Sequence, residues 1–365
     1  DPSLAALGMP DAFWAVTWAV LSIQLGLRAL ARPVPTILDT DIGTFIDDSF
    51  ALAQILRTPE LEVRLVVTAS HDTMGRAHIA AKYLSLVGAN HIPVGVGINT
   101  SNDTGPLFGW ARDFPLAQYE GGVHMDGVKA MQEVIDSCNS AHVALVEIGP
   151  HTNVKSLIER FPHVMPRVRV FAMGGNVRAG IHLPWGTVTP VNTTNERLDP
   201  PAARAMLHAR WNDLVVWAAL ETTVQVVISG TLWQTVKHSA DVHVRVLLDC
   251  FMYWWHESRR TSSWITHGEA MALDPTQHSA ILFDTLAVHL AAAGSWLELT
   301  ELTVDFSSFG RTLVMPASSS MGTRSRFALN FTRGGQGSFL ERLVTLLLGP
   351  PLAQRWLADD LVVNV

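Results

Sequence analysis

The residues best suited to chemistry are four aspartates that lie close together in the first part of the chain. Within ten residues, after an apolar run and around Gly43, come Asp39, Asp41, Asp47 and Asp48. Carboxylates this close destabilise one another unless a cation neutralises them, and Mg²⁺ and Ca²⁺ prefer carboxylate and backbone carbonyl oxygens as ligands. The spacing therefore predicts a site for a divalent cation.

The second pair of aspartates also has a simpler interpretation. Negative charges in the first turn of a helix are stabilised by the helix dipole, by about 0.3–1 kcal/mol each. Residues 49–56 carry apolar side chains at helical spacing, so this explanation covers Asp47 and Asp48. It does not cover Asp39 and Asp41, and the metal site is therefore the preferred hypothesis.

The elements that must position these acids are predicted from hydrophobic patterning. Apolar runs rich in β-branched residues alternate along the chain with amphipathic segments, and further helices are predicted in the last third. The predicted strands are residues 34–38, 63–68, 92–96, 143–148, 168–173 and 214–219, and the predicted helices before the last third are residues 49–56, 76–87, 126–136, 153–161 and 200–207.

This alternation is typical of an α/β fold with a mostly parallel central sheet flanked by helices. Ligands of such folds bind at the carboxyl ends of the strands. The acidic turn lies at one such end, as do residues 149–153 and 173–176. The segments 97–122 and 180–195 are long enough to be substrate loops.

Composition narrows the function classes. A chain of 365 residues that is 48% hydrophobic can bury one large core. A net charge of −7 without a basic run predicts that no nucleic acid polymer is bound, although a nucleoside is still compatible with it. Cys138 and Cys250 are too few for a zinc cluster or a disulfide framework, and we expect them to be core thiols.

The first 33 residues differ from the rest of the chain. We expect residues 1–33 to form an extra apolar N-terminal segment before an α/β domain at 34–365. The segment is similar to a signal peptide but lacks a basic start, so a helix docked on the domain, on a partner or on a membrane is the alternative. Asn102, Asn192 and Asn330 begin N-x-T sequons. We therefore expect a secreted protein, with a cytoplasmic one as the alternative.

Six short motifs follow one another in an order that is known from one enzyme family. They are residues 39–52, 92–97, 149–153, 173–175, Asn195 with 199–200, and 283–288. Over about residues 34–350 the chain resembles the inosine-uridine-type nucleoside hydrolases. These calcium enzymes cleave the N-glycosidic bond of nucleosides to ribose and free base. The resemblance implies a small-molecule nucleoside as the substrate and a homo-oligomer, either a dimer or a tetramer.

The resemblance also implies roles for individual residues. Asp41 would be the general base that activates a water, Asp47 would hold a ribose hydroxyl and Asp39 would support the metal site. The Ca²⁺ ligands would be the carboxylates of Asp41, Asp48 and Asp284 and the backbone carbonyl of Thr152. The further substrate contacts would be Asp72, Met173, Asn176, Thr187, Thr193 and Asn195.

Several residues depart from the family pattern. Phe283 stands where many relatives have the histidine that protonates the leaving base, and Thr187 and Thr193 stand where the family has an Asn and a Glu that bind the ribose 5′ hydroxyl. Phe45 replaces an acid that is common in the longer form of the acidic turn. We expect His124 to supply the missing acid, and other candidates near the base are His151, Trp110, Trp185, Trp254 and Trp255.

Two other functions are compatible with these residues. An intact metal site without its acid would make the protein a non-catalytic calcium or ribose binder. Residues 39–44 also resemble the nucleophile motif of haloacid dehalogenase-type phosphatases, in which one Asp attacks phosphorus. The phosphatase hypothesis leaves Asp47, Asp48 and residues 149–153 without a role.

Overall fold

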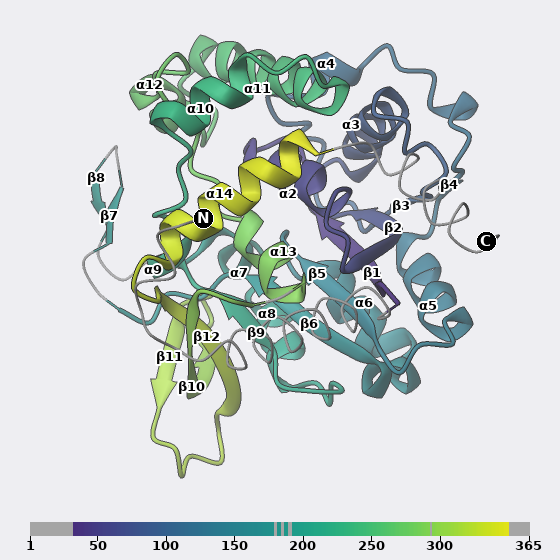
Figure 1. Cartoon of the computed structure of the whole chain (residues 1–365). Helices are drawn as coiled ribbons and strands as arrows, with labels where there is room; N and C mark the ends of the chain where they lie inside the picture. Colours follow the sequence, from purple (N-terminus) through teal and green to yellow (C-terminus); the bar gives the residue numbers. More distant parts are fainter. Residues whose placement is uncertain (1–31, 179–180, 184–185, 189–191, 293, 350–365) are drawn as a thin grey trace, which may run out of the picture. The chain divides into compact units, whose positions relative to one another are not determined.

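The computed structural model describes residues 32–178, 181–183, 186–188, 192–292 and 294–349 (Figure 1). Nearly all of the predicted N-terminal segment, residues 1–31, lies outside these ranges. Among the helices that are described, none combines the length and the apolar character needed to cross a membrane.

A ten-stranded sheet forms the centre of the α/β unit. Eight neighbouring strands run parallel, and two antiparallel strands extend one edge. In their order across the sheet the strands are β4 (Val123–His124), β3 (Val94–Val96), β2 (Leu61–Thr68), β1 (Val34–Thr40), β5 (Val143–Glu147), β6 (Val168–Met173), β9 (Val216–Ala218), β12 (Thr323–Phe331), β10 (Leu297–Phe306) and β11 (Thr312–Met315). The predicted mostly parallel α/β fold is confirmed.

The last third of the chain corrects the sequence prediction. Only helices were expected there, but β10, β11 and β12 add a strand region to the sheet. β10 exposes the four residues 298–301 in succession and so lacks the continuous apolar run that marks the inner strands. This edge of the sheet carries its own hairpin-like extension in Figure 1.

Helices cover both faces of the sheet, because the inner strands bury side chains on both sides. In β1, Leu38 packs into one hydrophobic core and its neighbour Ile37 into the other. The first core includes α2 (Asp47–Ile55), α3 (Thr73–Leu86), α11 (Val242–Arg260), α13 (Thr285–Ala292) and α14 (Gly335–Leu348), and the second includes α5 (Gly127–Ser137), α6 (Thr152–Arg160) and α8 (Pro200–His208).

Shorter elements fill the connections. The segment predicted as a first substrate loop, 97–122, contains α4 and η2, and the second, 180–195, contains the hairpin of β7 and β8. The bounds of these and the remaining elements are α4 (Phe108–Ala111), η2 (Leu116–Gln118), η3 (Pro162–Arg167), β7 (Ile181–Leu183), β8 (Gly186–Val188), α7 (Thr194–Leu198), α9 (Leu220–Thr223), α10 (Gly230–Lys237) and α12 (His267–Ala272).

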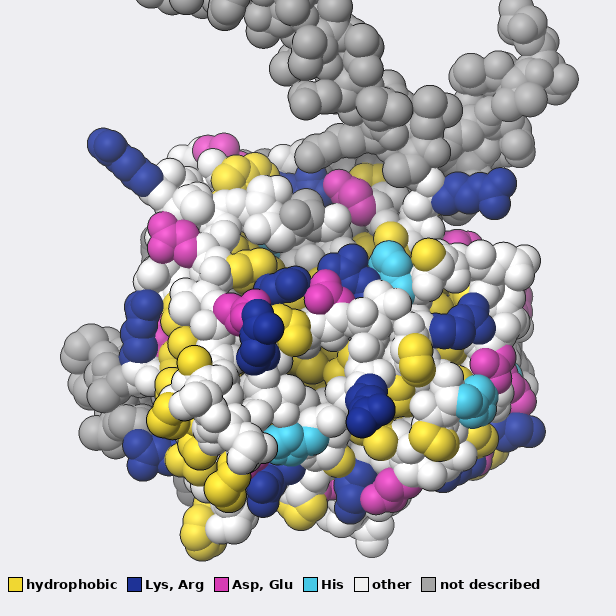
Figure 2. All heavy atoms as spheres, turned by 90° about the horizontal axis from the view of Figure 1, so that it is seen from below, with side chains coloured by type: hydrophobic (Ala, Val, Ile, Leu, Met, Phe, Trp, Pro, Cys, Tyr) yellow, Lys and Arg dark blue, Asp and Glu magenta, His cyan; other side chains and the backbone are white. Residues whose placement is uncertain are grey.

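The outer face of the unit carries both signs of charge. On the side shown in Figure 2, Lys and Arg side chains are interspersed with acidic and apolar ones. Long-range attraction of a polyanion needs a continuous field of one sign, which this mixture does not provide on that side.

A buried ion pair joins the helices that carry and cover the acidic turn. The guanidinium of Arg57, just after α2, binds both carboxylate oxygens of Asp241 at 2.7 and 2.8 Å and the carbonyl of Leu347 in α14 at 2.5 Å. Asp241 also caps α11, because it accepts hydrogen bonds from the backbone amides of His243 and Val244. The pair therefore fixes α2, α11 and α14 to one another.

We expect Asp241→Ala to lower the free energy of unfolding by about 3–5 kcal/mol, because it leaves the buried guanidinium of Arg57 without its counterion and α11 without its cap. Urea unfolding followed by circular dichroism measures this loss. Asp126→Ala is a matched control, since Asp126 caps α5 and binds Arg160 on the surface. We expect it to cost about 1 kcal/mol, and an equal loss in both variants would contradict the argument.

Candidate active site

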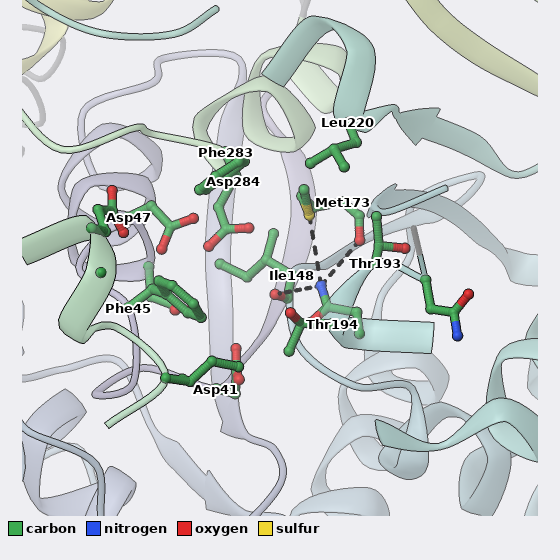
Figure 3. A pocket seen from close by; sticks show the side chains of 16 residues that line it. Asp41, Phe45, Asp47, Ile148, Met173, Thr193, Thr194, Leu220, Phe283 and Asp284 are labelled. Carbon is green, nitrogen blue, oxygen red and sulfur yellow. Dashed lines mark hydrogen bonds between the residues drawn. The ribbon is translucent and has the colours of Figure 1, made fainter. Parts of the chain in front are cut away.

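A pocket of about 290 Å³ lies where the carboxyl ends of four parallel strands meet. Asp41 follows β1, Ile148 follows β5, Met173 ends β6 and Leu220 follows β9, and all four line the pocket (Figure 3). Only β5 and β6 of these four strands follow one another in sequence, but β1, β5, β6 and β9 are neighbours in the sheet. The volume is close to the lower end of the range for small-molecule sites, roughly 300–1,000 Å³.

Three buried carboxylates crowd one wall of this pocket. Asp47 and Asp48 begin α2, and Asp284 lies directly before α13. Each of the three offers an oxygen within 4.8 Å of the others. Asp41 lines the same pocket from the end of β1, as Figure 3 shows. The structure thus brings together acids that are separated by more than half of the chain.

The electrostatics of this wall are unfavourable without a cation. Burial raises the pKa of Asp47 to about 7, and burial together with the neighbouring aspartates raises the pKa values of Asp48 and Asp284 well above their usual range. The Oδ1 atom of Asp47 is buried and has no hydrogen-bond partner among the described residues. A divalent metal ion is bound by several carboxylate oxygens. The wall of the pocket offers such oxygens, one of which accepts no hydrogen bond from the described residues, so the residues fit such an ion.

The acidic turn is held by groups behind it. Arg76 of α3 is fully buried and its guanidinium donates to the backbone carbonyl of Asp41. The indole of Trp254 in α11 donates to the carbonyl of Thr44 at 2.8 Å. Gly43 has a φ of 116°, which residues with a side chain rarely adopt. These contacts explain the single glycine in the acidic sequence and position Asp41 at the pocket.

Asp39 lies behind the pocket and does not line it. Its Oδ1 atom accepts a hydrogen bond of 2.9 Å from the Asn153 amide, and the strand register places Glu147 of β5 opposite it. Burial raises the pKa of Asp39 to about 7. Asn153 also accepts a hydrogen bond from the Ile98 backbone amide. This network ties the end of β1 to the start of α6.

The opposite wall is built by the segment that follows the β7–β8 hairpin. The Asn195 amide donates to the carbonyls of Ile148 and Met173, each at 3.1 Å, and these bonds are dashed in Figure 3. Glu196 accepts from the Thr193 hydroxyl and, at 2.9 Å, from the Gly175 amide. Sequence reasoning missed Glu196, which orients Thr193, because nothing in its neighbourhood marks it as buried.

Two predicted substrate residues do not line the pocket. The Asp72 carboxylate caps α3 by accepting from the Gly75 amide at 3.0 Å, and neither it nor Asn176 lines the pocket. Asn176 is buried, and its backbone amide donates to the Thr312 hydroxyl at 3.1 Å. Both residues follow parallel strands, but their side chains do not reach the pocket.

The structure also places the predicted acid His124 outside the pocket lining. It lies exposed on β4, at the edge of the sheet and three strands from β1, and does not line the pocket. Thr152 begins α6, and its hydroxyl donates to Asp199 at 2.8 Å. Thr187 belongs to β8, and its side chain lies outside the described part of the structure.

The aromatic candidates for the base do not line the pocket either. The Trp110 indole donates to Asp249 at 2.6 Å, and the Trp255 indole donates to the carbonyl of Ala270 at 3.1 Å. Trp254 supports the acidic turn, and Trp185 is outside the described residues. His151 is fully buried, with Nδ1 3.2 Å from Glu147. Of the described tryptophans and His151, none supplies a wall of the pocket.

Comparison with known proteins decides the family. Residues 36–332 match the family model described as inosine-uridine preferring nucleoside hydrolase. The chain belongs to this family. The resemblance predicted from the six motifs is thereby confirmed, and the protein is a divergent nucleoside hydrolase, an enzyme that acts on N-glycosyl compounds. Such membership is inconsistent with a haloacid dehalogenase-type phosphatase.

Individual relatives agree with the family assignment. The chain is 29% identical over 235 residues to the non-specific ribonucleoside hydrolase RihC of Klebsiella pneumoniae strain 342, which covers 58% of this chain and 72% of the relative. It is 28% identical over 225 residues to the inosine-uridine preferring nucleoside hydrolase of Leishmania major, over 56% of this chain and 66% of the relative. The fold is similar to that of the plant nucleoside hydrolase PpNRh1, with a TM-score of 0.69, 19% identity, and coverage of 87% of this chain and 100% of that one.

The pocket of this nucleoside hydrolase also has apolar lining. Phe45, Ile265, Leu220 and Phe283 line it, together with Glu269 from α12. Position 283 carries a phenylalanine where many relatives have a histidine by the resemblance, so a phenyl ring lines the pocket there. Glu269 has no local sequence signal, and only the packing of α12 reveals that it reaches the pocket.

The raised pKa of Asp39 predicts how stability depends on pH. The folded protein holds a proton on this group between its ordinary pKa of 3.8 and about 7, whereas the unfolded chain releases it, so the free energy of unfolding falls as the pH rises across this window. We expect Asp39→Asn to reduce the fall, because the amide does not ionise and keeps the oxygen that binds Asn153. Urea unfolding in the presence of chelator, at about pH 5 and about pH 8, measures this fall in the free energy of unfolding. An unchanged slope in the variant would contradict the assignment.

Proposed function

We propose that this protein hydrolyses the N-glycosidic bond of a ribonucleoside to free base and ribose. The observation that carries the proposal is the set of four carboxylates, from Asp41, Asp47, Asp48 and Asp284, that line one pocket at the strand ends. An N-glycosidic bond breaks through a state with positive charge on the sugar, which fixed carboxylates stabilise. Membership of the nucleoside hydrolase family supports the same reaction.

We propose Ca²⁺ as the metal. Asp41, Asp48, Asp284 and the backbone carbonyl of Thr152 would hold it. Asp48 and Asp284 belong to the group of close, buried carboxylates, whose third member is Asp47, and Asp41 lines the same pocket. A bound Ca²⁺ ion would supply a positive centre that orients the ribose diol and a water molecule. The hard oxygen donors of this set favour Ca²⁺ or Mg²⁺ over softer metals.

Individual residues of the chain then have separate roles in the reaction. Asp41 accepts a proton from the water that attacks the anomeric carbon, and Asp47 accepts a hydrogen bond from a ribose hydroxyl. Arg76 and Trp254 hold the turn that carries Asp41, so this general base is positioned before the substrate binds. Thr193, oriented by Glu196, faces the sugar from the opposite wall.

A non-catalytic calcium or ribose binder is the second candidate. It is favoured by Phe283, since a phenyl ring lines the pocket where a proton donor is expected. Such a binder would keep the carboxylates but release no base.

Release of free base from a panel of purine and pyrimidine nucleosides tests the proposal. We expect release by the purified full-length protein with calcium, loss of release with excess chelator, and recovery when calcium is added back. Calorimetric calcium binding without release from any nucleoside would instead establish the binder.

The metal assignment is tested by single substitutions. We expect Asp48→Ala and Asp284→Ala to abolish calcium binding in calorimetry, because each removes a buried ligand. Asp47→Ala should keep the metal and weaken ribose binding. Asp213→Ala, which removes a surface carboxylate paired with Arg169 and Arg326, serves as the control. Loss of calcium in Asp47→Ala, or full affinity in Asp284→Ala, would contradict the assigned ligand set.

A further inference from the structure

The pocket contains one carboxyl group that the proposed metal and sugar contacts do not use. The titratable residues among those that line it are Asp41, Asp47, Asp48, Asp284 and Glu269. The four aspartates form the acidic wall. Glu269 comes from α12 and lines the same pocket as Ile265 and Phe283, close enough to Asp47 for that carboxylate to act on it.

The two oxygens of Glu269 are in different situations. Oε1 accepts a hydrogen bond of 3.1 Å from the backbone amide of Ile281. Oε2 makes no hydrogen bond within the described residues, and the side chain lines the pocket while being only 5% exposed. The neighbouring Gly268 also lines the pocket, and a methyl group added there would meet no atom within 4 Å. A ligand group can therefore approach the carboxyl group from the pocket.

The helix that carries Glu269 is anchored. Trp255 of α11 donates from its indole to the carbonyl of Ala270, and Thr266 donates to the Ser258 hydroxyl at 2.9 Å. Each of these bonds joins α12 or its N-cap to α11. The carboxyl group is therefore held in place by backbone and side-chain contacts on both sides, as a group that transfers a proton must be.

The surroundings of Glu269 favour its protonated form. Burial, with a contribution from the carboxylate of Asp47, raises its pKa to about 8. A carboxyl group in an apolar pocket near a carboxylate is protonated at neutral pH, and it can then donate a proton while a second, ionised acid accepts one.

We propose that Glu269 is the general acid that protonates the leaving base, in the place of the histidine that Phe283 replaces. This inference rests on the proposed function. The bond from the anomeric carbon to the base nitrogen breaks, and its electron pair stays with the base. Glu269 transfers its proton to a ring nitrogen of the departing base, while the water oxygen bonds to the anomeric carbon and gives a proton to Asp41. Exchange with solvent restores both groups.

Glu269→Gln tests this role, because the amide keeps an oxygen for Ile281 but has no acidic proton. We expect kcat for nucleosides to fall by about 10²–10⁴-fold with a KM close to that of the wild type. A nitrophenyl riboside should be hydrolysed at nearly the wild-type rate, because nitrophenolate leaves without being protonated. Glu257→Gln removes a surface carboxylate that is paired with Arg260 on α11 and should behave as wild type.

The outcomes separate the inference from the function on which it rests. Unchanged turnover of nucleosides, or an equal loss on both substrates, would overturn the role of Glu269. Calorimetric loss of calcium binding in Glu269→Gln would also overturn it, since Glu269 would then belong to the metal site. If the wild type releases neither base nor nitrophenol, the proposed function itself fails.

A second variant covers the case in which Glu269→Gln does not fold. Phe283→His in the otherwise unchanged protein adds the family histidine beside Glu269. If Glu269 is already the acid, we expect the gain in kcat for nucleosides to stay below about threefold. A gain near the 10²-fold or more that general acids supply would show that the wild type has no acid, and would overturn the inference.

Discussion

The rest of the structure depends on keeping like charges together in a buried place. Asp47, Asp48 and Asp284 are almost fully buried and lie within reach of one another, although each carboxylate raises the cost of ionising the next. Such an arrangement persists only when the scaffold is rigid enough to resist the repulsion. The parallel strands, the buried Arg76 and the ion pair at Arg57 supply this rigidity, since they fix the chain on either side of the acidic turn.

The pocket combines carboxylates with apolar side chains. The end of β1, the first turn of α2 and the residue before α13 provide the aspartates. Phe45, Ile265 and Phe283 line the same pocket, as does Glu269. A nucleoside has a polar sugar and a base with flat apolar faces, so the proposed substrate offers a partner to both kinds of side chain.

Hydrophobic patterning predicted elements that are formed by continuous segments of the chain. It did not predict contacts between residues that are far apart in the sequence. The strand at residues 168–173 has the predicted bounds, because an uninterrupted apolar run is a sufficient signal for a buried parallel strand. β10 was not predicted because four of its ten residues are exposed in succession. Family resemblance located Asp284, which no pattern near it could do. The sequence around His124 gave no sign that it would pair at the edge of the sheet, outside the lining of the pocket, and Glu269 was missed because tertiary packing alone turns it toward the pocket.

The anchoring of α12 links the two kinds of acid in the pocket. Glu269 resides on a helix of six residues, tied to α11 by the indole of Trp255 and the hydroxyl of Thr266. The same α11 is joined to α2, which begins with Asp47 and Asp48, through the ion pair of Asp241 with Arg57. A substitution that shifts α11 would therefore change the position of Glu269 and of these aspartates together.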